Sequence, residues 1–324
     1  MSSKTSSNKQ AFVNRLRTFT KASNFGVIMI LGFLCLVLSI STRKFLTQQN
    51  LFSVMRAFSY VAIIAIGQCL VIITGGVDLS VGSVYGFAGL MTAFVLDRWG
   101  VPIPVGILLG MVVGTALGSA NGFLITKAKI PPFIATLGML SVARGLSYAL
   151  TTGYPIRTSS AFSKIGQGHL WLVPLPVVYM IVLAIIFSIF LNRTVIGRRI
   201  RAIGGNEEAS KVSGININGV KMVVYSLCGL LAGISGITTT ARLGVAQSTS
   251  GMGYELDVIA AVIIGGASLT GGKGTILGAV LGAAIMGVLR NGLILLNVSA
   301  YWQQTVLGFV VILAIAADQL RKRY

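Results

Sequence analysis

The chain has 324 residues, of which 54% are hydrophobic and only 10% are charged, with 40 glycines and a formal net charge of +19. A soluble globular domain carries about 25% charged residues, so this composition excludes a soluble enzyme and indicates an integral membrane protein. The 26 lysines and arginines gather largely at the chain ends and between apolar runs, where they set topology rather than form a nucleic-acid-binding face.

The first element is a basic tail over residues 1–24, followed by an apolar run over 25–40. No small-residue cleavage pattern ends this run, which is followed by Arg43 and Lys44. We therefore expect a retained first span with a cytosolic N-terminus rather than a cleavable signal peptide.

Ten apolar runs occupy residues 25–320, and a helix needs about 20 residues to cross a hydrocarbon core of roughly 30 Å. We expect one transmembrane domain: an all-α, polytopic bundle of about ten spans. The runs cover approximately 25–40, 55–74, 80–96, 102–125, 131–151, 173–191, 219–240, 255–268, 274–296 and 301–317. The eighth run is short, and to a lesser degree so are the first and third. Each is either a discontinuous or re-entrant helix or an ordinary tilted span with misplaced bounds.

Basic residues between the runs predict the orientation of the bundle. Lys127 and Lys129 separate the fourth and fifth runs, and a larger basic group lies in a loop over 192–218. Both connections are expected in the cytosol, as is the C-terminal segment 321–324, whereas the connection 153–172 falls outside. An even number of spans with both termini cytosolic fits this pattern.

Glycine spacing indicates close helix packing and a weak inverted repeat. Gly110, Gly114 and Gly118 recur every four residues, a pattern that lets helix backbones approach closely in lipid. Gly110, Gly114 and Asn121 are echoed by Gly278, Gly282 and Asn291 at offsets of 168 to 170, which five intervening spans would place in opposite directions. A second echo, 75–80 against 265–270, implies the same direction, so one duplication cannot explain both.

The connection between the second and third runs contains Asp78, Ser80 and Gly82. A carboxylate at membrane depth is costly and often marks function, so these residues are candidates for a translocation path or gate. The alternative is that Asp78 caps the helix that starts near Ser80, at the cytosolic membrane boundary.

The 192–218 loop contains a predicted short helix. Asn206 suits its N-cap, two acidic residues suit the positive end of its dipole, and Gly214 suits its end. Two helical turns are marginal alone in water, so a docking partner would explain their order; a solvated loop is the alternative. The residues concerned are Gly204, Gly205, Asn206, Glu207, Glu208, Ala209, Lys211 and Gly214.

Glu255 and Asp257 open the eighth run. At i and i+2 they do not share a helix face, so a metal clamp is not expected, and first-turn acidic residues that complement the helix dipole are the simpler interpretation. Arg242 is the nearest basic residue in sequence. Both carboxylates are further candidates for the path or gate.

Other sites are not expected. Cys35, Cys69 and Cys228 lie within apolar runs and suit buried hydrophobes, and His169 is the single histidine. The segment 271–275 lacks the residues of a phosphate loop. We expect no catalytic residue, metal or cofactor on this chain.

The three polar segments resemble one known family. The motifs are Gly76-x-Asp78-Leu-Ser-Val-Gly82, Ala202-Ile-Gly-Gly-Asn206-x-x-Ala209, and Tyr254-Glu-Leu-Asp257 followed by Gly265-Gly-x-Ser-Leu-x-Gly271-Gly. In this order the motifs resemble those of the permease subunits of bacterial sugar ABC importers of the ribose, xylose, arabinose and galactoside type. The likeness extends over nearly the whole chain, from about residue 25 to 320.

The resemblance implies a subunit of the bacterial inner membrane, paired with itself or with a similar permease, that carries a neutral monosaccharide. A separate ATPase subunit, typically two fused nucleotide-binding domains, would use the ATP, and a periplasmic binding protein would deliver sugar. The helix after Asn206 would then be the coupling helix seated in the ATPase. Seven acidic residues in the whole chain suit a neutral cargo.

Two alternatives stay open at this point. Related permeases carry nucleosides, branched-chain amino acids or a signalling furanose, and sequence alone does not separate these cargoes. An ATP-independent channel would be expected to line its pore with polar or charged rings, and none is evident.

Overall fold

The computed structural model describes residues 25–321. The predicted basic tail over 1–24 and residues 322–324 of the predicted C-terminal segment lie outside the described residues.

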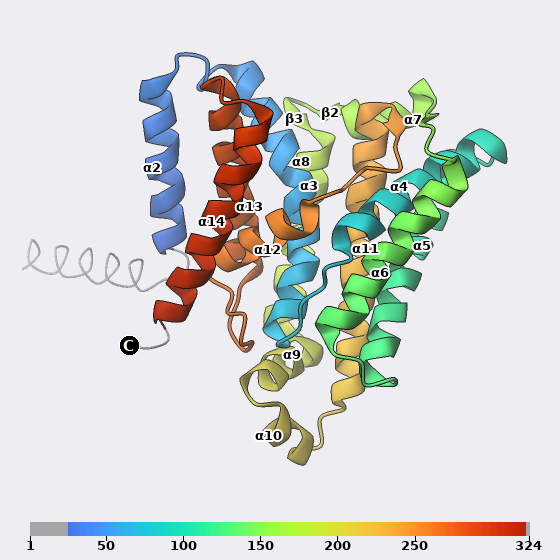
Figure 1. Ribbon diagram of the computed structural model, residues 1–324, viewed down its shortest axis with the longest axis vertical. Coiled ribbons are helices and arrows are strands. Elements are labelled where there is room, and N and C mark those ends of the chain that lie inside the picture. Colours follow the sequence, from blue (N-terminus) through green and yellow to red (C-terminus); the bar gives the residue numbers. More distant parts are fainter. Residues whose placement is uncertain (1–24, 322–324) are drawn as a thin grey trace, which may run out of the picture.

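Helices dominate the described residues, with two pairs of two-residue strands (Figure 1). The helices are α2 (Phe25–Ser41), α3 (Gln48–Ile73), α4 (Val81–Arg98), α5 (Ile103–Thr126), α6 (Pro132–Thr151), α7 (Ser160–Gln167), α8 (Leu175–Arg193), α9 (Val195–Gly205), α10 (Glu207–Val212), α11 (Ile217–Leu243), α12 (Tyr254–Ile264), α13 (Ile276–Leu295) and α14 (Ala300–Arg321). The strands are β1 (Ile156–Arg157) with β4 (Val245–Ala246), and β2 (His169–Leu170) with β3 (Val173–Pro174), both antiparallel.

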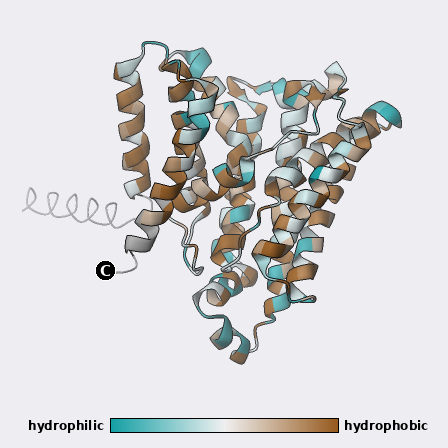
Figure 2. Cartoon of the chain, in the orientation of Figure 1, coloured by the Kyte–Doolittle hydropathy of each residue, from teal (hydrophilic) through white to brown (hydrophobic). Residues whose placement is uncertain are grey.

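Each of the ten predicted runs lies on one helix, so the prediction of an all-α polytopic bundle is confirmed. Six helices of the described chain, α3, α5, α6, α8, α11 and α13, are long and apolar enough to cross a membrane. Figure 2 shows hydrophobic residues along these helices and hydrophilic ones at α10. The short helix α7 and the strands were not predicted.

Two spans are broken. Helix α12 has 11 residues, about 16 Å at 1.5 Å per residue, which is half of a hydrocarbon core. A non-helical segment, 247–253, precedes it, and another, 74–80, precedes α4. Figure 1 shows α4 and α12 starting near mid-height of the bundle. The third and eighth runs are therefore discontinuous, whereas the first is the continuous helix α2.

The broken spans are enclosed by the long helices. Helix α4 is buried over most of its length and packs against α5, α6 and α11, while α12 packs against α3, α13 and α14. Enclosure is what permits non-helical backbone at membrane depth, because lipid offers no hydrogen-bond partners.

The order of the elements supports the inverted repeat. Helices α3 and α11 have 26 and 27 residues, and each precedes a non-helical segment, a short enclosed helix and a longer helix. The C-terminal end of α3 and the N-terminal end of α11 both lie toward α9 and α10, so the two helices run in opposite directions (Figure 1). Echoed glycines Gly114 and Gly282 fall on the corresponding helices α5 and α13.

The predicted glycine packing is confirmed between α5 and α11. A Cβ atom at Gly114 would lie 2.6 Å from the carbonyl oxygen of Gly229 and 3.1 Å from the Cα of Gly233. Because both neighbours are backbone atoms, a larger side chain would have to push the helices apart.

Gly114→Ala is expected to destabilise the protein by about 1–3 kcal/mol through overpacking, seen as a lower midpoint of thermal denaturation in detergent. Gly138→Ala on α6 is the matched control, because nothing lies within 4 Å of a Cβ there and alanine favours helix by about 1 kcal/mol. Equal midpoints for the two variants would contradict the close-packing argument.

Candidate coupling segment and buried polar sites

The chain between α8 and α11 forms two capped helices. Thr194 begins α9, its Oγ1 accepting a hydrogen bond from Gly197 N at 3.0 Å. Asn206 is extended at φ −159°, ends α9 and caps α10, its Oδ1 accepting from Ala209 N at 2.9 Å. The predicted N-cap is thus confirmed, and so is the stop at Gly214, which has φ +78°.

Helix α9 was not predicted, although its apolar residues Ile196, Ile200 and Ile203 follow a helical period. Gly204 and Gly205 therefore end a helix rather than lie in a loop. The basic group predicted for this connection, Arg198, Arg199 and Arg201, lies on α9.

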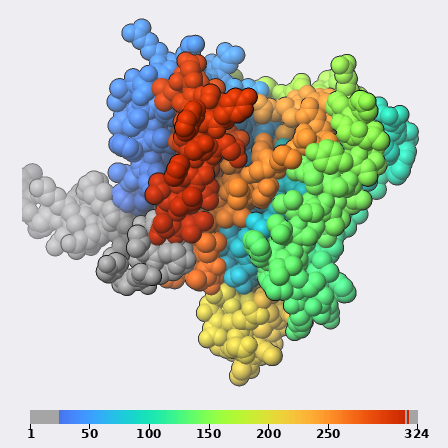
Figure 3. Space-filling view, in the orientation of Figure 1, coloured from blue at the N-terminus to red at the C-terminus, as the bar shows by residue number. Residues whose placement is uncertain are grey.

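Helix α10 protrudes from one end of the bundle (Figures 1 and 3). Its residues Glu208, Ala209 and Lys211 are exposed, and Val212 is 89% exposed. Ser210 is buried, with its Oγ donating to Asn206 O at 2.8 Å. This protruding, capped surface has the form of a docking element.

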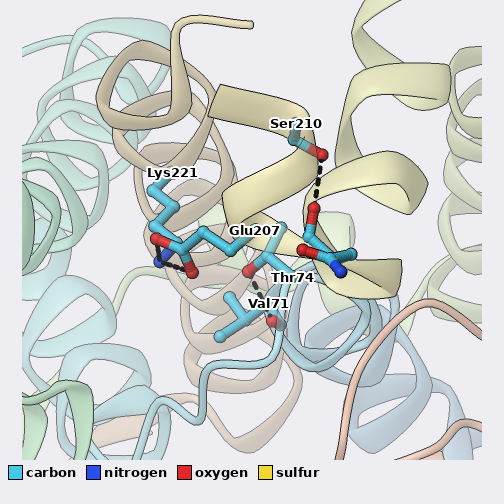
Figure 4. A network of polar contacts seen from close by, with 6 residues as sticks. Val71, Thr74, Glu207, Ser210 and Lys221 are labelled. Carbon is cyan, nitrogen blue, oxygen red and sulfur yellow. Dashed lines mark hydrogen bonds and ion pairs between the residues drawn. The ribbon is translucent and has the colours of Figure 1, made fainter. Parts of the chain in front are cut away.

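One ion pair ties α10 to the bundle. Lys221 Nζ on α11 lies 2.8 and 2.9 Å from the two carboxylate oxygens of Glu207. Figure 4 draws this ion pair near Thr74 and Ser210. Glu207 and Lys221 also line a polar cavity of about 260 Å³. Glu208 and Lys211 line a second polar groove, of about 370 Å³, which extends to Lys129.

Glycines join the α9 end to both broken spans. A Cβ at Gly204 would collide with the carbonyl oxygen of Ile73, the last residue of α3, and with the Gly272 amide. Gly272 N donates to Ile73 O at 2.9 Å. A Cβ at Gly271 would lie 3.0 Å from Gly204 Cα and 3.1 Å from Gly75 N. The connections that follow α3 and α12 therefore meet at the end of α9, in what we call the glycine junction: Ile73, Gly75, Gly204, Gly271 and Gly272.

Asp78 is buried, with 1% of its surface exposed. Its Oδ1 accepts from Ser80 N at 2.8 Å and from Ser80 Oγ at 2.6 Å. Asn121 on α5 donates to Ser80 Oγ at 2.8 Å and to Asp78 Oδ2 at 3.5 Å. The side-chain amide of Gln68 donates to the backbone C=O of Asp78 and accepts from its N–H.

The alternative of Asp78 as the N-cap of α4 is wrong, because Ser80 holds that position. Its carboxylate accepts hydrogen bonds from Ser80, the residue before α4. The side chain is buried inside the fold. The cluster instead pairs the buried polar groups around Ser80, although Asn121 Oδ1 makes no hydrogen bond in the described structure. Asn121 was not predicted as a site residue, although it belongs to the sequence repeat that pairs it with Asn291.

The two broken spans meet at their helix starts. A Cβ at Gly82 would collide with the carboxylate of Glu255 and the carbonyl of Gly251. Arg144 on α6 fixes the non-helical segment, because its Nη1 donates to Ser248 O at 2.7 Å and to Ser250 O at 2.8 Å. The predicted Gly82 and Glu255 are thus neighbours, and Arg144 is a polar residue that sequence reasoning missed.

Asp257 pairs with Arg290 of α13, whose Nη2 lies 2.6 Å from Asp257 Oδ2. Arg242, the nearest basic residue in sequence, is not its partner; its guanidinium lies 5.6 Å from the ring centroid of Tyr60. Arg290 reaches Asp257 because α12 and α13 pack side by side.

The structure thus separates the predicted residues into two groups. Residues 204–214 form the protruding end, and Asp78, Ser80, Gly82, Glu255 and Asp257 lie on or beside the broken spans. The glycine junction connects them.

Comparison with known proteins gives one family. Residues 50–315 match the family described as branched-chain amino acid transport system / permease component. The chain is 42% identical over 319 residues to the ribose import permease protein of Escherichia coli (strain K12), covering 96% of this chain and 98% of that protein.

Two further relatives cover similar lengths. The ribose import permease protein of Bacillus subtilis (strain 168) is 42% identical over 315 residues, 94% of this chain and 98% of that one. The D-allose transport system permease protein of Escherichia coli (strain K12) is 35% identical over 304 residues, 91% of each.

Asp78→Ala is expected to lower stability by about 1–3 kcal/mol, because it removes a buried acceptor from Ser80 and Asn121. Asp97→Ala, at the exposed end of α4, is the control and should leave the thermal midpoint in detergent unchanged. A stable Asp78→Ala protein that fails to transport would show instead that the carboxylate acts on the cargo.

Proposed function

Because the chain belongs to the branched-chain amino acid transport system / permease component family, we propose that it is the membrane-spanning permease subunit of an ATP-driven importer of a neutral monosaccharide. Relatives of nearly full-length coverage that are named for ribose import and for D-allose transport support this cargo. A relative named for xylose transport is 34% identical over 86% of this chain. No relative described above is named for an amino acid.

The observation that carries the proposal is this full-length likeness combined with a capped helix that protrudes from the bundle. We propose that α10 docks in a separate ATPase subunit, with two fused nucleotide-binding domains, which binds and hydrolyses the ATP. The coupling residues would be Gly204, Gly205, Asn206, Glu207, Glu208, Ala209, Lys211 and Gly214. The chain itself would be no enzyme and would hold no cofactor or metal.

The orientation follows from this docking. The α10 end would face the cytosol of a bacterium, with both termini on that side of the inner membrane, and the basic residues of α9 together with Lys127 and Lys129 suit the cytosolic side. A periplasmic sugar-binding protein would deliver cargo to the opposite end. A second permease copy, identical or similar, would complete the path, and no nucleic acid is involved.

The mechanism uses the glycine junction. When the ATPase closes, α10 moves, and Gly204 transmits the motion by backbone contact to the chain after α3 and the chain after α12. Packed helices have discrete arrangements, so the bundle would switch between outward-open and inward-open states. We propose that Asp78, Ser80, Gly82, Glu255 and Asp257 form or position the gate where the broken spans meet.

Transport by the complete system tests the proposal. Vesicles containing this chain, its ATPase and a binding protein should accumulate labelled ribose or xylose only when ATP is supplied, and should not accumulate leucine. Accumulation of leucine instead of sugar would favour the amino-acid alternative. Equilibration of sugar without ATP would indicate a channel.

Glu208→Lys is expected to reduce ATP-driven uptake by about tenfold or more, because reversing a charge at a docking surface costs several kcal/mol. Less ATPase should also co-purify with this variant. The matched control is Asp97→Lys, which makes the same charge change at an exposed site on α4. Equal uptake by the two variants would exclude α10 as the docking element.

A further inference from the structure

A cavity of about 330 Å³ lies among α3, α11, α12 and α13. Its walls come from the start of α3 and the ends of α11 and α13, which point away from α10, and Tyr254 and Asp257 of α12 also line it. The cavity therefore lies between the end opposite α10 and the second broken span. Its size falls in the range of about 300–1,000 Å³ of small-molecule sites.

Two buried hydroxyls on the cavity wall make no hydrogen bond of good geometry, although Arg242 lies beside the Tyr60 hydroxyl and Tyr85 beside the Thr239 hydroxyl. Tyr60 of α3 and Thr239 of α11 are 3% and 8% exposed, and neither hydroxyl oxygen makes a hydrogen bond in the described structure. An unpaired buried hydroxyl carries a desolvation cost. A ligand with hydroxyl groups of its own would relieve that cost.

The remaining polar groups suit the same kind of ligand. The Arg242 guanidinium lies over the Tyr60 ring at 5.6 Å, and Asp257 has a second carboxylate oxygen beyond the one that Arg290 binds at 2.6 Å. The cavity wall thus combines hydrogen-bond donors and acceptors with the Tyr60 ring and with apolar residues such as Val54 and Met286. A monosaccharide presents this combination of hydroxyls and C–H surface.

We infer that this cavity is a binding site for the transported monosaccharide within a single permease subunit, with Tyr60, Thr239, Arg242 and Asp257 as its polar contacts. The inference rests on the proposed function. Tyr254 and Asp257 begin α12, and the chain after α12 reaches Gly204 through Gly271 and Gly272. Sugar in the cavity would therefore contact the helix whose following chain reaches the glycine junction.

The test is saturation-transfer NMR of D-ribose, D-xylose and D-allose with the full-length chain in lipid nanodiscs, without the binding protein. The wild type should bind at least one of these sugars saturably. Tyr60→Phe and Thr239→Val remove one hydroxyl each without changing side-chain shape, and each should weaken binding by about two- to tenfold.

Thr238→Val is the matched control, because the Thr238 hydroxyl bonds to Ile234 O within its own helix at 2.7 Å. Its sugar affinity should equal that of the wild type. The site is overturned if the wild type shows no saturable binding, if all variants bind equally, or if inorganic phosphate displaces the sugar while a second sugar does not.

The two proposals fail separately. ATP-driven sugar uptake in vesicles with unaltered binding by Tyr60→Phe and Thr239→Val would reject the cavity and keep the permease function. Absence of ATP-driven sugar uptake by the wild type would reject the permease function itself.

Discussion

The absence of water from the hydrocarbon core governs this fold, because every backbone N–H and C=O at that depth needs a partner within the protein. Unbroken helices meet the requirement alone, but the non-helical segments 74–80 and 247–253 do not. In the first segment, the Asp78 carboxylate accepts from the Ser80 N–H, and Gln68 pairs with the backbone of Asp78. In the second, Arg144 donates to two backbone carbonyls. The buried residues Gln68, Asp78, Ser80 and Asn121 are thus explained by the first break, whereas buried hydroxyls such as those of Thr92, Ser147 and Thr151 bond to carbonyls of their own helices. The long helices enclose both breaks.

Backbone contact, rather than charge, is the stronger link between α10 and the bundle. In the Glu207–Lys221 ion pair, 48% of the Glu207 side-chain surface and 18% of that of Lys221 are exposed. Ion pairs open to solvent contribute roughly 0–1 kcal/mol to stability. At Gly204, by contrast, a single added methyl group would collide with Ile73 and Gly272. Contacts between main-chain atoms are stiff. A displacement of α9 is therefore transmitted to the connections after α3 and after α12 rather than absorbed by the movement of flexible side chains.

Much of the fold could be predicted from the sequence, because long apolar runs and capping residues are local signals. All ten runs lie on helices, and Asn206 and Gly214 end helices as their chemistry requires. Helix α7 and the short strands carry no strong apolar signal. The partners of residues far apart in sequence could not be predicted. Asp257 pairs with Arg290 rather than with Arg242, because the packing of α12 against α13 brings Asp257 and Arg290 together. The cavity likewise depends on tertiary packing, because Tyr60 and Thr239 stand 179 positions apart in sequence.

The two broken spans differ in length rather than in how closely they pack, because a Cβ at Gly282 of α13 would collide with the carbonyl oxygen of Ala261 in α12. The difference in length bears on which of them moves. Helix α4 is fixed at its start by Asp78, Ser80 and Asn121, and a Cβ at Gly89 would lie 2.7 Å from the Gly236 carbonyl of α11. The chain at the start of α12 exposes Met252 (64%) and Leu256 (51%), and α12 extends only half the core thickness. A short helix can shift along its axis without drawing an end through the hydrocarbon boundary. Helix α12, rather than α4, is therefore the element better suited to convert a displacement at the glycine junction into a change near the cavity.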